Sequence, residues 1–249
     1  MVEKEIILET KQISKSFGHV EVLKNIDFEL HKNEILALLG DNGAGKSTLI
    51  KIISGVYESD GGEIKVFGKN VHFKSPYDAR SIGIETIYQD LALFDNLNIM
   101  ENIYAGKEVV GKGLKRLLGF VDRKTMHKNS QETMNKLGIN VDDYFENVNN
   151  FSGGQRQSVA ISKAIYWGNK IVIMDEPTAA LGVKEQGNLM QLIKDLKQHD
   201  VSVILIMHNI EQVLQVAERA IILKRGERVG TVNCNQSTEC HDNIVKMLM

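Results

Sequence analysis

A glycine-rich loop, Gly40 to Thr48, constrains this chain more than any other feature. It reads Gly-Asp-Asn-Gly-Ala-Gly-Lys-Ser-Thr and fits the phosphate-loop pattern G-x4-G-K-S. The loop directly follows Ile35 to Leu39, and an entirely apolar run of this length is typical of a parallel strand buried on both faces. The residues from Ser47 to Ser54 read as a helix that Gly55 ends. A strand, this loop and a helix in that order predict a site for the phosphates of a nucleotide.

Each residue type in the loop suits that site. Glycines let backbone N–H groups converge on phosphate oxygens, and the start of the helix adds a positive field there. Lys46 would reach the β- and γ-phosphates, and the Ser47 hydroxyl is a ligand for Mg²⁺. The predicted nucleotide contacts in the loop are Gly40, Asp41, Asn42, Gly43, Ala44, Gly45, Lys46, Ser47 and Thr48.

Two carboxylates follow a second apolar run, Ile171 to Met174. Because ligands of open parallel sheets bind at the carboxyl ends of the strands, we expect Asp175 and Glu176 to face the phosphate loop. Asp175 would then hold Mg²⁺, and Glu176 would polarise the water that attacks the γ-phosphate. For the pair taken alone, the alternative is an acidic start to the helix after Pro177.

His208 ends the apolar run Val201 to Met207 in the same way. A single histidine is most often solvated or part of a core. Its place at the end of a buried strand makes it a candidate to donate a hydrogen bond to the γ-phosphate or to orient Glu176.

The remaining pattern predicts an α/β fold. Helical stretches such as Arg123 to Leu137, ended by Gly138, occupy the chain from about residue 90 to 150 and read as an insertion in an α/β core. Buried strands that alternate with helices imply a mostly parallel sheet. The other expected strands are Ile6 to Ile13, Ile26 to Leu30, a hairpin of Glu63 to Phe67 and Val71 to Phe73, and a closing hairpin of Ala220 to Leu223 and Val229 to Val232.

Composition narrows the class of protein. A net charge of -2 leaves no basic excess for a phosphate backbone, so we expect no nucleic-acid partner. The apolar runs are far shorter than the roughly 20 residues of a membrane-spanning helix. The first residues lack a secretion signal, which favours the cytoplasm, and Cys234 and Cys240 are expected to be reduced thiols there.

A second string, Ser-Gly-Gly-Gln-Arg-Gln, begins at Ser152. Ser152 followed by Gln155 forms a helix-capping box, so a well-capped helix of no special function is the local alternative. Two glycines at the first helical positions cost about 1–2 kcal/mol relative to alanine, which a simple cap would not require. A glycine-lined helix start therefore indicates an anion site.

With both strings present, the chain resembles the nucleotide-binding subunits of ABC transporters, and the resemblance covers essentially its whole length. It implies a P-loop NTPase (RecA-like) core, an N-terminal antiparallel β subdomain and an inserted α-helical subdomain. The chain would form a single domain over 1–249, with the core at about 1–89 and 157–249 and the helical subdomain at about 90–156. In this family Ser152, Gly153, Gly154 and Gln155 would bind the γ-phosphate held by another copy, so that a head-to-tail homodimer encloses two ATP molecules.

The resemblance assigns further roles. Gln89 matches the glutamine loop that senses Mg²⁺ and the attacking water, and His208 matches the histidine switch. Phe17 falls where the family stacks an aromatic ring on adenine. Gly182 departs from the family, because many members carry Asp there to form cross-subunit hydrogen bonds.

A finer resemblance, to bacterial monosaccharide importers of the ribose, xylose and fructose type, rests on the phosphate loop, on Asp78 to Leu93 and on Thr178 to Gly182. It implies two membrane-spanning permease subunits, indirect coupling to a solute-binding protein, and a peripheral location on the cytoplasmic face of the cell membrane. We expect the permeases to dock around Leu91 to Tyr104; the alternative is that the same side chains fill the helical subdomain's own core. The side chains concerned are Leu91, Leu93, Phe94, Ile99, Met100 and Tyr104.

Three other functions compete with this one. An ABC ATPase of DNA repair or chromosomes would insert a long coiled coil or a zinc-binding cysteine cluster, and a ribosome-associated one would fuse two copies through a basic linker; the sequence has none of these. A regulator that binds ATP without hydrolysing it would not need Glu176 and His208.

Overall fold

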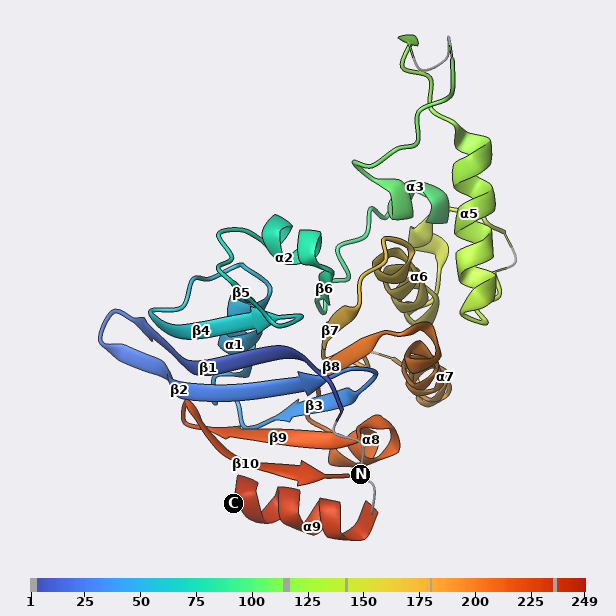
Figure 1. Ribbon diagram of the computed structural model, residues 1–249. Helices are drawn as coiled ribbons and strands as arrows, with labels where there is room; N and C mark the ends of the chain where they lie inside the picture. Colours follow the sequence, from blue (N-terminus) through green and yellow to red (C-terminus); the bar gives the residue numbers. More distant parts are fainter. Residues whose placement is uncertain (1–3, 114–116, 142, 180, 235–236) are drawn as a thin grey trace. The chain divides into compact units, whose positions relative to one another are not determined.

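The computed structural model describes residues 4–113, 117–141, 143–179, 181–234 and 237–249 (Figure 1). The chain forms two compact units, which are described separately. Unit 1 comprises Met1–Gln89, Asn169–Pro177 and Ile193–Met249, and unit 2 comprises Asp90–Gly168 and Thr178–Leu192. No helix of the described residues is long and apolar enough to cross a membrane.

The centre of unit 1 is a six-stranded sheet with the order β10-β9-β3-β8-β7-β6. The five strands from β9 to β6 are parallel, and β10 pairs with β9 in the antiparallel sense. Every residue of β3 and β8 is buried, as expected for apolar strands in the middle of a parallel sheet. The strands are β3 (Ile35–Leu39), β6 (Ile84–Ile87), β7 (Ile171–Asp175), β8 (Ser202–Ile206), β9 (Arg219–Lys224) and β10 (Glu227–Asn233).

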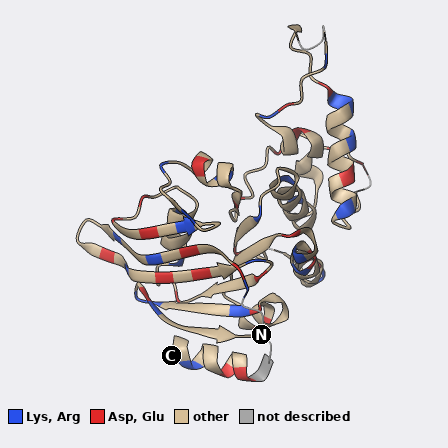
Figure 2. Cartoon of the chain, in the orientation of Figure 1, with Lys and Arg blue, Asp and Glu red and all other residues tan. Residues whose placement is uncertain are grey.

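A second sheet in unit 1 is antiparallel, with the order β2-β1-β4-β5. Its strands are β1 (Ile6–Phe17), β2 (Val20–His31), β4 (Gly61–Val66) and β5 (Lys69–Val71). Figure 2 shows lysines and acidic residues interspersed along β1, β2 and β4. The sheet buries the side chains of its other face, Leu8, Ile13, Ile26, Phe28 and Leu30 among them, in the core that it shares with α1.

Local signals explain the helices of unit 1. The phosphate loop leads into α1 (Lys46–Ile53), which ends before Gly55 at φ +75°. Ser75 caps α2 (Pro76–Ile82), with proline at the first helical position, where its fixed φ suits the start of a helix. The other helices of unit 1 are α8 (Ile210–Val216) and α9 (Ser237–Leu248), preceded by the 3₁₀ turn η2 (Leu196–His199).

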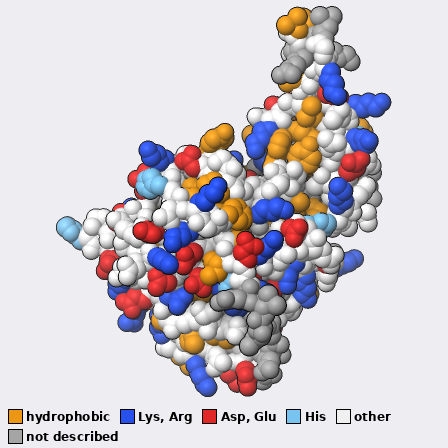
Figure 3. Space-filling view, viewed as in Figure 1, with side chains coloured by type: hydrophobic (Ala, Val, Ile, Leu, Met, Phe, Trp, Pro, Cys, Tyr) orange, Lys and Arg blue, Asp and Glu red, His pale blue; other side chains and the backbone are white. Residues whose placement is uncertain are grey.

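Unit 2 is helical. It contains α3 (Ile99–Tyr104), α5 (Arg123–Lys136), the 3₁₀ turn η1 (Val148–Asn150), α6 (Gly153–Tyr166) and the larger part of α7 (Val183–Asp195). Between α3 and α5 the chain extends as a narrow arm, closed by the bridge between Val110 and Val121 (Figure 1). Near its end Leu117, Leu118 and Phe120 are largely exposed, and Figure 3 shows hydrophobic side chains there.

The structure corrects several local expectations. The β4–β5 turn consists of Phe67 and Gly68, both at positive φ, so β5 begins two residues earlier than predicted. Strand β6 was not expected, because its four residues include Glu85 and Thr86 and lack a continuous apolar run. Cys234 and Cys240 are joined in a disulfide, so the expectation of reduced thiols is wrong.

The expected docking surface is also partly wrong. Ile99, Met100 and Tyr104 are at most 5% exposed and belong to the core of unit 2, because they lie on the inner side of α3. Phe94 is 52% exposed, and Leu91 and Leu93 are partly exposed. Of the six side chains expected to dock, Leu91, Leu93 and Phe94 therefore keep surface that a partner could contact.

A buried ion pair joins the residue before β3 to the first residue of β9. Glu34 is 1% exposed, and its carboxylate lies 2.8 Å from Nε of Arg219 and 3.0 Å from Nδ1 of His31. We predict that Arg219→Met lowers the free energy of unfolding by about 3 kcal/mol, because it leaves Glu34 buried without its cation. Urea unfolding measures the change. Arg228→Met, at an exposed position of β10, is the matched control; a loss as large as that of Arg219→Met would contradict the prediction.

Candidate functional site

The carboxyl ends of four neighbouring parallel strands define the candidate site in unit 1. Leu38 of β3 pairs with Ile206 of β8, Ile206 pairs with Asp175 of β7, and Met174 pairs with Ile87 of β6. This register places the residues that follow each strand at one edge of the sheet. They are the phosphate loop after β3, His208 after β8, Asp175 and Glu176 at the end of β7, and Gln89 after β6.

Two glycines of the phosphate loop are required by packing. A Cβ on Gly40 would lie 2.3 Å from the carbonyl oxygen of Leu223, and one on Gly45 would lie 2.6 Å from Cδ2 of Leu23. A Cβ on Gly43 would meet nothing within 4 Å. The outer glycines thus hold the loop against β9 and β2, and the middle of the loop faces open space.

Lys46 lies under this loop and is 6% exposed. Its Nζ donates hydrogen bonds to the carbonyl oxygens of Gly40 and Asp41, at 2.7 and 3.1 Å. Burial lowers the pKa of the ammonium group, and the charges of Glu176 and Asp175 act against that shift. The lysine is therefore held close to Glu176, the predicted catalytic base, and to Asp175, the predicted metal ligand.

Asp175 shows the opposite shift. Burial raises the pKa of its carboxyl group, and the neighbouring charge of Glu176 raises it further. Lys46, Lys51 and His208 oppose the shift without cancelling it. Two carboxylates at the end of one buried strand thus favour an additional cation beside them.

Glu176 and His208 are in direct contact. His208 Nε2 lies 2.7 Å from Oε1 of Glu176, and the backbone N–H of Glu176 donates to the carbonyl of Ile206 at 3.0 Å. Glu176 has φ +49°, a left-handed conformation that is costly for a residue with a side chain. This contact is the geometry that the predicted orienting role of His208 requires.

Phe17, the predicted adenine contact, lies at the end of β1 and is 44% exposed. Its ring packs edge-to-face against Tyr57, with centroids 5.3 Å apart, and the Nζ of Lys15 lies 5.7 Å from its centroid. Gln89, which follows β6, is also exposed. Both side chains remain accessible to a ligand.

The string Ser152 to Gln155, called here the signature start, belongs to unit 2. Ser152 precedes α6, accepts a hydrogen bond from Gln155 N–H and receives the Gln155 side chain at its own N–H, as the capping box predicts. A Cβ on Gly153 would lie 2.8 Å from Cδ2 of Leu181, and one on Gly154 would lie 3.3 Å from Cβ of Glu185. Packing within unit 2 therefore accounts for part of the glycine requirement, which the sequence argument attributed to an anion alone.

Two features near the signature start are not indicated by any pattern in the sequence: the position of Glu185, and the ion pair of Arg156 with Asp95, whose charged atoms are 2.5 Å apart. Both involve contacts between segments that are distant in the chain, so no local pattern could indicate them.

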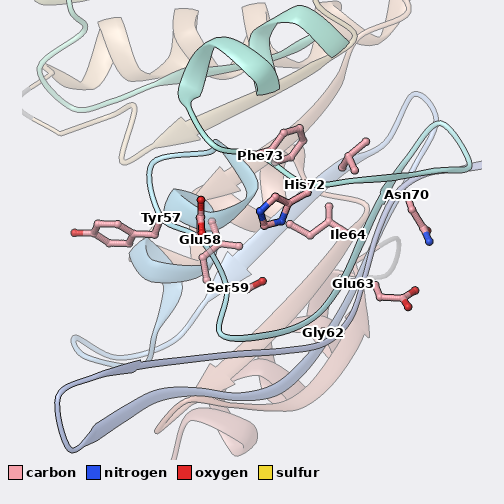
Figure 4. A pocket seen from close by; sticks show the side chains of 11 residues that line it. Tyr57, Glu58, Ser59, Gly62, Glu63, Ile64, Asn70, His72 and Phe73 are labelled. Carbon is pink, nitrogen blue, oxygen red and sulfur yellow. The ribbon is translucent and has the colours of Figure 1, made fainter.

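A separate hollow of about 140 Å³ lies between the end of α1 and the β4–β5 hairpin (Figure 4). Tyr57, Glu58, Asn70, His72 and Phe73 line part of it. Its volume is below the roughly 300 Å³ at the small end of ligand pockets, and it holds none of the predicted site residues.

Comparison with known proteins identifies the family. The model of the family described as ABC transporter matches residues 23–179, a span that includes the phosphate loop, the signature start and both carboxylates. The chain belongs to the ABC transporter family. It is an ATP-binding domain of that family and an ABC-type ATPase, as the resemblance implied.

Similar proteins are import ATP-binding proteins. The chain is 48% identical to the xylose/arabinose import ATP-binding protein of Sulfolobus acidocaldarius, over 89% of this chain and 86% of that one. It is 43% identical to the fructose import ATP-binding protein of Rhizobium meliloti, over 92% and 89%. A ribose import ATP-binding protein of Rubrobacter xylanophilus is 41% identical over 98% of this chain, which spans 47% of that protein.

A solved structure confirms the fold class. A nucleotide-free ATP-binding cassette from an ABC transporter superimposes with a TM-score of 0.81 and 23% identity, over 97% of this chain and 95% of that one. The predicted α/β fold, with a mostly parallel core sheet and an antiparallel N-terminal sheet, is thus confirmed.

We predict different costs for alanine at two glycines of the phosphate loop. Gly40→Ala would lower the free energy of unfolding by about 3 kcal/mol, because its Cβ overlaps the backbone of β9. Gly43→Ala would cost about 1 kcal/mol, from its φ of +81° alone. Urea unfolding without nucleotide compares the two variants, and equal losses would contradict the assignment.

Proposed function

We propose that the chain is the ATP-hydrolysing subunit of an importer that takes up a monosaccharide. The observation that carries the proposal is the set of four groups at one sheet edge, the phosphate loop, Gln89, the Asp175–Glu176 pair and His208. The printed names of its relatives, which import xylose or arabinose, fructose and ribose, support the class of solute.

In this proposal each nucleotide site is shared by two copies of the chain. The phosphate loop and Lys46 of one copy hold the phosphates, with Asp41, Asn42, Gly43, Ala44 and Thr48 among the contacts and Phe17 beside the base. Ser152, Gly153, Gly154 and Gln155 of the second copy close the site over the γ-phosphate. ATP then favours the closed homodimer, and hydrolysis releases it.

The residues present fit a magnesium ion. Asp175 offers a carboxylate, Ser47 a hydroxyl and Gln89 an amide oxygen, and Mg²⁺ prefers such oxygen donors. Within the described residues no group of three His, Cys, Asp or Glu side chains forms a metal cage, which suits an ion that also uses waters and substrate phosphates. When bound, the ion would neutralise charge on the phosphates.

The chain's own groups position the attacking water. The Glu176 carboxylate accepts a hydrogen bond from the water. His208, whose Nε2 lies 2.7 Å from Oε1 of Glu176, fixes the direction of that carboxylate. Lys46 stabilises negative charge as the bond to the γ-phosphate breaks. No covalent intermediate with the protein is required.

For the assembly we propose two membrane-spanning permease subunits and a solute-binding protein, with the chain attached to the cytoplasmic face of the membrane. Of the six side chains first considered for docking, Leu91, Leu93 and Phe94 retain exposed surface for a permease helix. The division into a core at about 1–89 and 157–249 and a helical subdomain at about 90–156 remains part of this proposal.

We predict that Glu176→Gln traps an ATP-bound dimer. The amide keeps the shape of the side chain but cannot act as a base, so ATP binds and closes the dimer while hydrolysis falls by at least about 100-fold. Light scattering after gel filtration with ATP measures the dimer, and phosphate release measures turnover. Glu211→Gln, on α8, is the control and keeps wild-type turnover.

Three results would reject the proposal. Absence of Mg-dependent ATPase activity in the wild-type chain would favour a regulator that only binds nucleotide. A Glu176→Gln protein that remains monomeric with ATP would contradict the shared site, as would failure of Ser47→Cys in one copy to cross-link with Ser152→Cys in another when nucleotide is bound.

A further inference from the structure

A carboxylate of the same chain lies against the signature start. The side chain of Glu185, in the first turn of α7, lies beside Gly154, and the Ser152 hydroxyl and the Gly154 N–H help to hold the pKa of its carboxyl group below the ordinary value. The carboxylate accepts a hydrogen bond from the N–H of Gly182, at 3.2 Å. The Cβ and Cγ of Glu185 fill the space beside Gly154, 3.3 and 3.4 Å from the place of an added Cβ. All these residues belong to unit 2.

The contact is more than a cap for α6. Ser152 and Gln155 already form a reciprocal capping box, so α6 is capped without Glu185. What Glu185 adds is a negative charge at a helix start where a hydroxyl and an N–H converge, a position that favours anions. Hydrogen bonds from these groups lower the pKa of Glu185, which keeps the carboxylate charged.

The donors concerned are the ones that the proposed function requires. The Ser152 hydroxyl and the Gly154 N–H would bind the γ-phosphate carried by a second copy. One set of donors cannot serve a carboxylate and a phosphate together, and the two anions repel each other at that distance. One of them must withdraw.

We propose that Glu185 occupies the γ-phosphate position of the signature start and withdraws when the partner's ATP arrives, so that it sets the ATP concentration at which the dimer closes. The inference rests on the proposed function and adds an internal competitor to it. Glu185 is a positioning residue, because it acts on Ser152 and Gly154 and contacts no reacting atom.

Glu185 also accepts from Gly182, just before α7, and could simply stabilise its own helix. The substitution Glu185→Gln separates the two roles. Glutamine can form the same helix-start hydrogen bond, but it brings no charge to the signature start.

The test uses the full chain with Glu176→Gln to stop hydrolysis. The ATP concentration that gives half-maximal dimer, from analytical ultracentrifugation, is compared with and without Glu185→Gln. We expect it to fall about three- to tenfold, because closure no longer displaces an anion. Glu132→Gln, a carboxylate exposed on α5 of the same unit and paired only loosely with Lys128 at 3.8 Å, is the control and leaves it unchanged.

Glu185→Asp keeps the charge and serves as a second variant. The ATP concentration for half-maximal dimer in the Glu185→Asp protein should be closer to that of the chain with Glu185 than to that of the Glu185→Gln protein. An ATP requirement that is unchanged or higher in Glu185→Gln, or an aspartate that behaves like glutamine, overturns the inference while the dimer itself stands. If neither protein dimerises with ATP, the shared site is rejected and the inference with it. Melting temperatures without nucleotide confirm that each variant is folded.

Discussion

The site of unit 1 depends on parallel register. Hydrogen bonds between β3, β8, β7 and β6 bring four segments that are far apart in the sequence to one edge of one sheet. The backbone pairing alone produces this alignment, because strands of a parallel sheet have their carboxyl ends at the same side of the sheet. In β3, β7 and β8 the strand interior is apolar and buried, and the polar residues of the site begin at or just after the strand end. In these three segments, burial and chemistry therefore divide at about the same point.

At that edge an acidic and a basic side chain are both held where burial disfavours their charged forms. Burial raises the pKa of Asp175 and lowers that of Lys46, so each group is held in surroundings that disfavour its charge. Glu176 adds a left-handed backbone conformation fixed by its hydrogen bond to Ile206. A magnesium ion beside Asp175 and a phosphate beside Lys46 would relieve both charges together. The strain thus has the sign expected of a site prepared for a metal–nucleotide pair.

The sequence predicts those helices and strands whose signals lie within the element itself or in the residues next to it. Strand β3, helix α1, the proline-led α2 and the closing hairpin of β9 and β10 follow from apolar runs, glycines and caps within a few residues. Strand β6 escaped prediction because Ile84–Ile87 becomes a strand only through pairing with β7. The buried side of α3 and the Cys234–Cys240 disulfide likewise depend on what folds against them.

The glycines of the signature start show the same limit. The sequence suggested that an anion explains both, but Leu181 and Glu185 also require the space. These two side chains lie in the segment that directly follows β7, four and eight residues after Pro177. A short stretch of chain thus connects Glu176 to the residues that contact Ser152 and Gly154. The space at these two glycines is thus set by side chains far from Ser152 in the sequence, which no pattern around Ser152 could indicate.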